Sequence, residues 1–131
     1  MPDAPPYEHL VDELLKRIPA FATEREIDES YVSHDDDSPY LVFGDFGRFL
    51  VNVLRNRAYQ MEREKLLADS FELLGEMATS SDDEVINVAE TTVFEALSDS
   101  PETVAAARKY LSERAVPVFE RVARLWPSAS S

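Results

Sequence analysis

Apolar residues recur every three or four positions along most of the chain, the spacing that places them on one face of an α-helix. Near the N-terminus this pattern predicts a helix at about Tyr7–Ile18. Pro19 should end that helix, because a proline ring cannot continue the helical hydrogen bonding. A short helix is expected near Thr23–Tyr31, and the polar residues 34–39 that follow are expected to form a loop.

The middle of the chain combines an extended pattern with a helical one. Residues 40–43 are a continuous apolar run, expected to be extended and to end at Gly44. Asp45 is then the predicted N-cap of a helix at about Phe46–Asn56, since its side chain can accept a hydrogen bond from the first turn. The next helix is predicted at about Gln60–Thr79. Its inner stripe is expected to comprise Leu67, Phe71, Leu74 and Ala78.

Polar residues mark where two further helices begin. Ser81 and Glu84 have the spacing of a capping box, which predicts a helix from this point to about Ser98. Ser100 and Pro101 are typical of an N-cap and a first helical residue, so another helix should begin there. The inner faces of these two helices are expected to contain Ile86, Ala89, Val93, Leu97, Val104, Ala107 and Leu111.

These patterns predict a single all-α domain over residues 1–131, with about five to seven antiparallel helices. Pro117 should separate the last helix, at about Val118–Trp126, from the one before it. Short connections also allow stacked helical hairpins of the HEAT type, although no internal repeat is evident. Residues 1–6 and 127–131 are expected to be flexible ends. The core positions of the last helix are expected to be Phe119, Val122, Leu125 and Trp126.

Composition narrows the possible functions. The 131 residues include 26 Asp and Glu, 13 Lys and Arg and no cysteine, so the formal net charge is −13. Such an excess of acids repels phosphate groups and argues against binding to nucleic acid or to an anionic membrane. The absence of cysteine removes disulfides, thiolate nucleophiles and cysteine-ligated metals. No apolar run is long enough for a transmembrane helix or a signal peptide, and we expect a cytoplasmic protein.

The negative charge is concentrated in one part of the chain. Residues 69–102 contain ten Asp and Glu, and no Lys or Arg occurs anywhere in residues 66–107. Residues 38–68 and 103–131 each contain more bases than acids. Surface helices normally mix the two signs. Two interpretations remain open: a surface that confers solubility, or a face that binds a basic partner through complementary potentials.

If the acidic segment is a binding face, its exposed carboxylates should be the contacts. Aromatic side chains in nearby loops could supply the buried centre that such an interface needs. The candidate partner-binding residues are Asp69, Glu72, Glu76, Asp82, Asp83, Glu84, Glu90, Glu95, Tyr31 and Tyr40.

Motifs that would indicate catalysis or metal binding are weak. Residues 45–47 (DFG) match a metal-binding triplet of protein kinases, but the other kinase motifs are missing. His34 and the aspartates at 35–37 offer nitrogen and oxygen ligands, yet they lack the alternation and the glycine of a calcium loop. No grouping of Ser, His and Asp follows from spacing. The sequence therefore predicts no catalytic residue, no metal and no cofactor.

Four stretches of the chain carry a family resemblance: residues 14–21 (LLKRIPAF), 39–49 (PYLVFGDFGRF), 83–87 (DEVIN) and 94–97 (FEAL). Over about residues 10–126 the chain is similar to a bacterial family of small proteins of unknown function. Members of that family resemble immunity proteins of polymorphic toxin systems, which are small acidic helical proteins that neutralise a cognate toxin domain. The resemblance implies a basic toxin partner, such as a nuclease whose phosphate-binding cleft an acidic inhibitor could occupy. It transfers no catalytic residue.

We therefore expect a non-enzymatic inhibitor that binds one toxin domain through its acidic helical surface. Charge would set the association rate, and a few buried aromatic contacts would set the dissociation rate. One alternative is a helical scaffold that binds a protein or peptide in a groove between hairpins. Another is a metal-binding protein or enzyme centred on His34 and its neighbouring aspartates.

Overall fold

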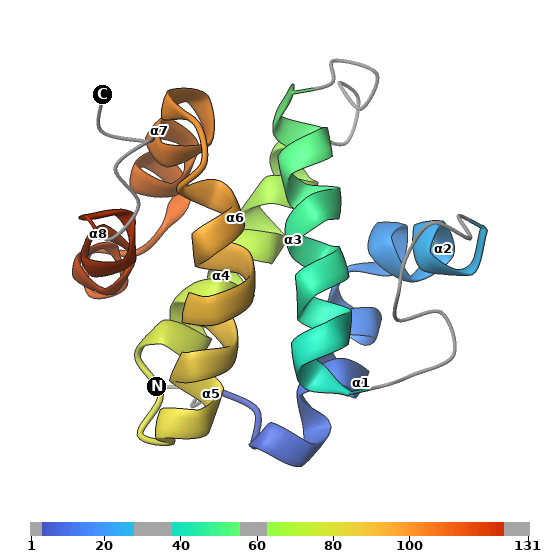
Figure 1. The fold of residues 1–131 in the computed structure, drawn as a ribbon. Helices are drawn as coiled ribbons and strands as arrows, with labels where there is room; N and C mark the ends of the chain where they lie inside the picture. Colours follow the sequence, from blue (N-terminus) through green and yellow to red (C-terminus); the bar gives the residue numbers. More distant parts are fainter. Residues whose placement is uncertain (1–3, 28–37, 56–62, 125–131) are drawn as a thin grey trace.

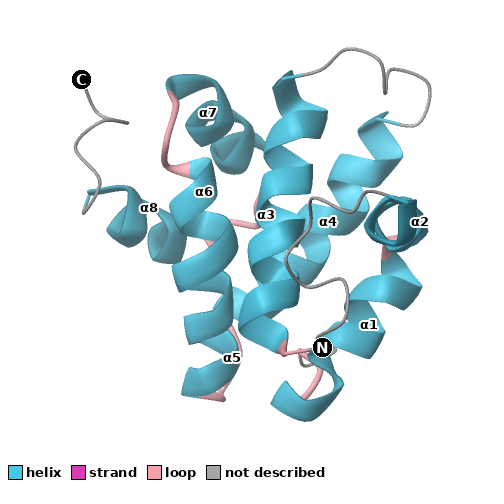
Figure 2. Cartoon of the chain, turned by 45° about the vertical axis from the view of Figure 1, so that its right-hand side comes forward, coloured by secondary structure: helices cyan, strands magenta, loops and turns pink. Residues whose placement is uncertain are grey.

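The computed structural model describes residues 4–27, 38–55 and 63–124, and every regular element within these ranges is helical (Figure 1, Figure 2). This confirms the predicted all-α fold. In chain order the elements are the 3₁₀ turn η1 (Tyr7–His9), α1 (Leu10–Arg17), α2 (Pro19–Ile27), α3 (Pro39–Arg55), α4 (Arg63–Ala78), α5 (Asp83–Val88), the π-helical η3 (Ala89–Phe94), α6 (Glu95–Leu97), α7 (Pro101–Tyr110) and α8 (Val116–Arg124).

Helix α3 forms the centre of the molecule, and Figure 1 shows α7 and α8 to one side of it and α2 to the other. It packs against α1, α5, η3, α6 and α7. Phe21 of α2 lies against two of its rings, with centroids 5.3 Å from Phe46 and 5.4 Å from Phe49. Each such buried side chain contributes about 1.5–3 kcal/mol of transfer free energy. The buried apolar residues of α3 are Val42, Phe43, Phe46, Phe49, Leu50 and Val53.

The start of α3 corrects the predicted boundary. Residues 40–43 are helical and not extended, and the helix begins at Pro39. The amide of Val42 donates to the carbonyl of Ser38 at 2.9 Å, which closes the first turn. Asp45 is therefore not an N-cap: it lies inside the helix, is 1% exposed, and its carboxylate is 3.7 Å from Arg48. The apolar run is helical because the core covers one continuous face of all four turns.

Helix α4 and the helix that follows it form the predicted antiparallel pair. Helix α4 packs against α5 and η3, and its predicted inner stripe is buried. The cap of α5 differs from the prediction: Asp82, not Ser81, accepts the hydrogen bond from the amide of Glu84, at 2.9 Å. Asp82 takes this position because its backbone is already extended, with φ −97° and ψ 113°, one residue later than expected. Residues 56–62, which include the predicted start of α4, lie outside the described ranges.

A π-helical stretch lies where two helices come closest. Elements α5, η3 and α6 run on as one helix over residues 83–97, because the residues at both junctions have α-helical backbone angles. Helix α3 approaches this helix at Gly47. A Cβ atom at Gly47 would lie 3.3 Å from the Cα of Val93 and 3.3 Å from the Cβ of Ala96. The hydroxyl of Thr92 donates to the carbonyl of Val88 within the widened turn. Gly47, the last residue of the DFG triplet, therefore has a packing role.

The last two helices, α7 and α8, are defined by a capping serine, a proline in each first turn and two ion pairs. Ser100 accepts a hydrogen bond from the amide of Thr103, and Pro101 occupies the first turn of α7, as predicted. Pro117 does not separate two helices; it lies in the first turn of α8, where its missing amide hydrogen costs nothing. Two arginine–glutamate pairs hold α8 in place, Arg108 with Glu120 and Arg121 with Glu90. The predicted core positions Leu125 and Trp126 lie outside the described ranges.

The Arg108–Glu120 pair should make stability depend on pH in the acid range. The hydrogen bond from Arg108 lowers the pKa of Glu120, so this contribution is present at neutral pH and is lost as the pH falls through that lowered pKa. Glu120→Gln should therefore cost about 1 kcal/mol or less at pH 7, because the pair is partly exposed. Thermal unfolding at several pH values checks this: the difference between wild type and Glu120→Gln should vanish in acid, whereas a constant difference would contradict it.

Candidate functional site

Residues 66–107 contain no Lys or Arg, but in the structure arginines of other helices form ion pairs with some of their acids. Glu76 of α4 is 15% exposed and receives two hydrogen bonds of 2.8 Å from Arg17 of α1. Glu90 of η3 lies 2.6 Å from Arg121 of α8. The acidic segment is thus partly neutralised by helices that are distant in the sequence.

Arg17 lies among three carboxylates. Besides Glu76, its guanidinium is 3.7 Å from Glu72 and 4.0 Å from Glu13. The hydrogen bonds with Glu76 are the main cause of a raised pKa for Arg17, so this guanidinium stays charged. One cation therefore faces three acids, and the excess negative charge faces solvent mainly at Glu72, whose side chain is 68% exposed. We call Glu72 and Glu76 the α4 ridge.

Three further acids of the hairpin lie together where α4 is followed by α5. Asp82, Asp83 and Glu84 are all exposed, and none of the three forms an ion pair with a described Lys, Arg or His. We call these three residues the acidic turn. Two of them also serve the fold, because Asp82 caps α5 and Glu84 accepts a hydrogen bond of 2.8 Å from the hydroxyl of Tyr40. Asp83 is the member of the acidic turn that has no such role among the described contacts.

The candidate tyrosines and the other acids lie in different surroundings. Tyr40 is half-buried: its hydroxyl also accepts a hydrogen bond from the side-chain Nδ2 of Asn87 at 2.8 Å, and its ring packs edge-on against Tyr7. Partial burial, and to a lesser extent Glu84, raise the pKa of Tyr40, so its phenol stays protonated. Burial also raises the pKa of Glu95 on α6. Asp69 pairs with Lys65 on α4 at 2.6 Å. Tyr31 lies outside the described ranges.

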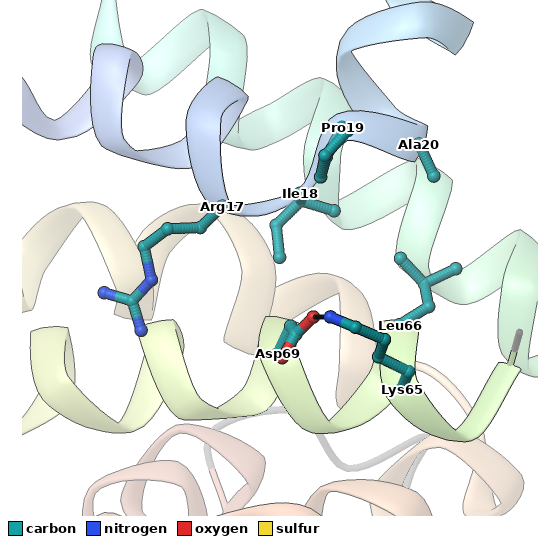
Figure 3. Close-up of a pocket in the computed structure, with 7 residues that line it drawn as sticks. All are labelled: Arg17, Ile18, Pro19, Ala20, Lys65, Leu66 and Asp69. Carbon is teal, nitrogen blue, oxygen red and sulfur yellow. Dashed lines mark hydrogen bonds and ion pairs between the residues drawn. The ribbon is translucent and has the colours of Figure 1, made fainter.

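Hollows lined by described residues adjoin α4, and three of them differ in size and lining. The smallest, about 210 Å³, lies under the α1–α2 corner, where Figure 3 shows Ile18 above α4 and the Lys65–Asp69 pair along it. A second, of about 560 Å³, lies between α4 and α7 and includes Phe71 and Tyr110. A third, of about 670 Å³, lies between η1, α1 and α4. The α4 ridge lines both larger hollows.

Sequence reasoning did not find the α4–α7 hollow. Its lining includes Gly75 and Tyr110, neither of which belongs to the predicted contact set. One signal was present, since Gly75 is an isolated glycine inside a predicted helix and such a residue often has a packing or functional reason. Tyr110 carried no local signal, because its stacking on Phe71 joins two helices far apart in the chain.

The described part of the chain contains neither a cluster of metal-ligand side chains nor a membrane-spanning helix. No group of three or more His, Cys, Asp or Glu side chains there could hold a metal ion. His9, the histidine within the described ranges, is exposed at the end of η1, and the alternative site at His34 lies outside those ranges. Among the described helices, none is both long and apolar enough to cross a bilayer.

One of three comparisons with known proteins gives a match, and that match shows the family. Neither a comparison with curated proteins nor one with solved structures gives a match. A family model described as Domain of unknown function (DUF7674) matches residues 11–127, which includes every α-helix described above except the first residue of α1. The match covers most of the 131 residues, so the chain belongs to the DUF7674 family.

Proposed function

We propose that the protein is a non-enzymatic inhibitor of the immunity type, which binds a basic toxin domain with one-to-one stoichiometry. Its contact surface consists of exposed acidic residues of the α4–α5 hairpin, namely Glu72 and the three residues of the acidic turn. The observation that carries the proposal is the excess of carboxylates at these positions in a chain of net charge −13. Complementary potential of this kind accelerates encounter with a basic partner and selects against acidic ones.

Ion pairs within the chain reduce the number of acids that can attract a partner. Asp69, Glu76 and Glu90 are already held by cations of the same chain, so they contribute less to attraction than their number in the sequence suggests. The acidic turn lies at the end of the helical hairpin, between the C-terminal end of α4 and the N-terminal end of α5. The partner is accordingly expected to approach this end of the molecule.

The variants that test the proposal should leave the fold intact. Reversing Asp82 or Glu84 would remove the α5 cap or the Tyr40 hydrogen bond, so the better pair is Glu72→Lys with Asp83→Lys. A matched control is Glu26→Lys with Glu113→Lys, two exposed acids outside the proposed surface. Both double variants carry the same charge, −13 + 4 = −9.

Each protein serves as bait in a pull-down from the cells that produce it, washed at about 0.15 M and about 1 M salt, where screening lengths are about 8 and 3 Å. Wild type and control should retain one dominant basic protein in near-equal amount at low salt, and the Glu72/Asp83 variant should bind it about tenfold less. The purified partner should lose its activity at one equivalent of wild type. Equal capture by both double variants, a bait that returns alone, or a partner that stays active in the complex would contradict the proposal.

A further inference from the structure

The two sides of the α4–α7 hollow carry opposite charges. The α4 ridge, Glu72 and Glu76, lines one side, and Lys109 and Arg114 line the side formed by α7 and the turn after it. Two acids and two bases make this face locally neutral in a chain of net charge −13. A second copy of the chain can therefore approach this face with less repulsion than it would meet at the acidic turn.

Three of these four charges are not neutralised within one copy. Neither Lys109 nor Arg114, both exposed, forms an ion pair with a carboxylate of the described residues. Glu72 is 68% exposed, and its contact with a described cation is the long 3.7 Å approach to Arg17. Glu76, by contrast, receives two hydrogen bonds of 2.8 Å from Arg17. Glu72, Lys109 and Arg114 can therefore pair with charges of another molecule.

A fixed aromatic pair joins the two sides of the hollow. Tyr110 of α7 stacks on Phe71 of α4 with ring centroids 5.6 Å apart and an angle of 15° between the planes. The hydroxyl of Tyr110 donates to the carboxylate of Glu64, with both oxygens at 3.0 Å. The two charged sides are thus held in a fixed relation to each other, so a partner with matching charges loses little affinity to ordering this face.

A face with acids on one side and bases on the other is complementary to itself. In a dimer with two-fold symmetry the same face of each copy is buried, and its two sides lie in reverse order across the partner. The acidic α4 side of one copy then lies opposite the basic α7 side of the other, and every acid–base contact occurs twice. Exposed ion pairs are individually weak, so a dimer held in this way dissociates readily.

We propose that the face around the α4–α7 hollow binds a second copy of this chain in a weak two-fold dimer, in which Glu72 of each copy pairs with the Lys109 and Arg114 side of the other. The dimer does not depend on the function proposed above, but Glu72 belongs to both surfaces. A basic partner that engages Glu72 therefore competes with the second copy, and the complex with that partner contains one copy of this chain.

Sedimentation equilibrium of the purified full chain tests the dimer without any other protein. Over about 10 µM to about 1 mM, a range suited to weak association, the average mass of wild type should rise toward that of two chains. Glu72→Lys should weaken association about tenfold, because like charges then face each other at both contacts. Glu26→Lys, an exposed α2 control of the same charge, −13 + 2 = −11, should associate at least as well as wild type.

Mixing two variants distinguishes a pair between copies from a structural effect. Lys109→Glu should also weaken association, because its carboxylate then faces Glu72 of the other copy. An equimolar mixture of Glu72→Lys and Lys109→Glu should restore association, since opposite charges again meet at both contacts of the mixed dimer. Unfolding curves show whether each variant folds. If a charge reversal unfolds the chain, Glu72→Gln and Lys109→Gln replace it, and each should weaken association about threefold.

The outcomes distinguish the dimer from the proposed function. Three results would each overturn the dimer, even if the pull-down returns a basic partner: a wild-type mass of one chain at every concentration, equal association of Glu72→Lys and Glu26→Lys, or a mixture that associates no better than its two components. Association that Glu72→Lys weakens and the mixture restores, combined with a pull-down that returns no partner, would support the dimer and contradict the inhibitor.

Discussion

Replacing Gly47 by valine is expected to lower the free energy of unfolding by about 3 kcal/mol, because overpacking at a tight helix contact forces the backbone to move. Even a single added carbon would lie 3.3 Å from the Cα of Val93 and 3.5 Å from the carbonyl oxygen of Thr92. Both atoms belong to the backbone and cannot rotate aside. Valine adds two further methyl groups, so α3 and η3 must separate along the contact that joins them.

Gly44 provides the matched control for this substitution. It lies one turn earlier on the same helix, and a Cβ atom there would meet nothing within 4 Å. Gly44→Val should therefore change stability by less than about 0.5 kcal/mol. Urea unfolding followed by circular dichroism measures both variants. If the two valines have the same effect, the close approach of α3 to η3 at Gly47 is not what limits the side chain there.

Replacing Arg17 by alanine should cost about 2 kcal/mol, less than breaking a fully buried ion pair because the site is partly open to water. Arg17 is 22% exposed and Glu76 15% exposed, so the loss of the guanidinium leaves a mostly buried carboxylate with Glu13 and Glu72 nearby. The three acids would then repel one another without a shared cation. Chemical unfolding of the variant and of wild type measures this loss of free energy of unfolding. The slopes of the two transitions should be equal.

A double-mutant cycle isolates the Arg17–Glu76 interaction. Glu76→Gln removes the charge of the carboxylate while keeping its size, and the double variant should lose about 1 kcal/mol less than the sum of the two single variants. Strict additivity would mean that the two residues stabilise the protein independently.

Helix propensity and capping along the chain are predictable because they act between near neighbours. The stripe Leu67, Phe71, Leu74 and Ala78 is buried as expected, and Ser100 and Pro101 begin α7 as expected. The predicted helix boundary was wrong where two local patterns competed, at the start of α3. Residues 40–43 satisfied both an extended and a helical pattern, and only the core on one face of α3 decided between them.

The candidate site was predictable in part, because the concentration of acids along the chain is a local property of the sequence. The sequence placed ten acids without a base in residues 69–102, and four of the exposed ones, Glu72 and the acidic turn, form the proposed contact surface. It could not indicate which acids find cations elsewhere in the chain. Glu90 and Arg121, for example, are 31 positions apart, and their pairing depends on how α8 packs against η3.

By itself the sequence determined the helical class, most of the inner stripes, the Ser100 cap and the concentration of negative charge, since each depends on residues within a few positions of one another. The tertiary structure alone decided which acids remain exposed, why Gly47 must lack a side chain, and that Gly75, Tyr110 and Glu72 share one hollow. These features join residues tens of positions apart, whose proximity arises only when the helices bury their apolar faces against one another.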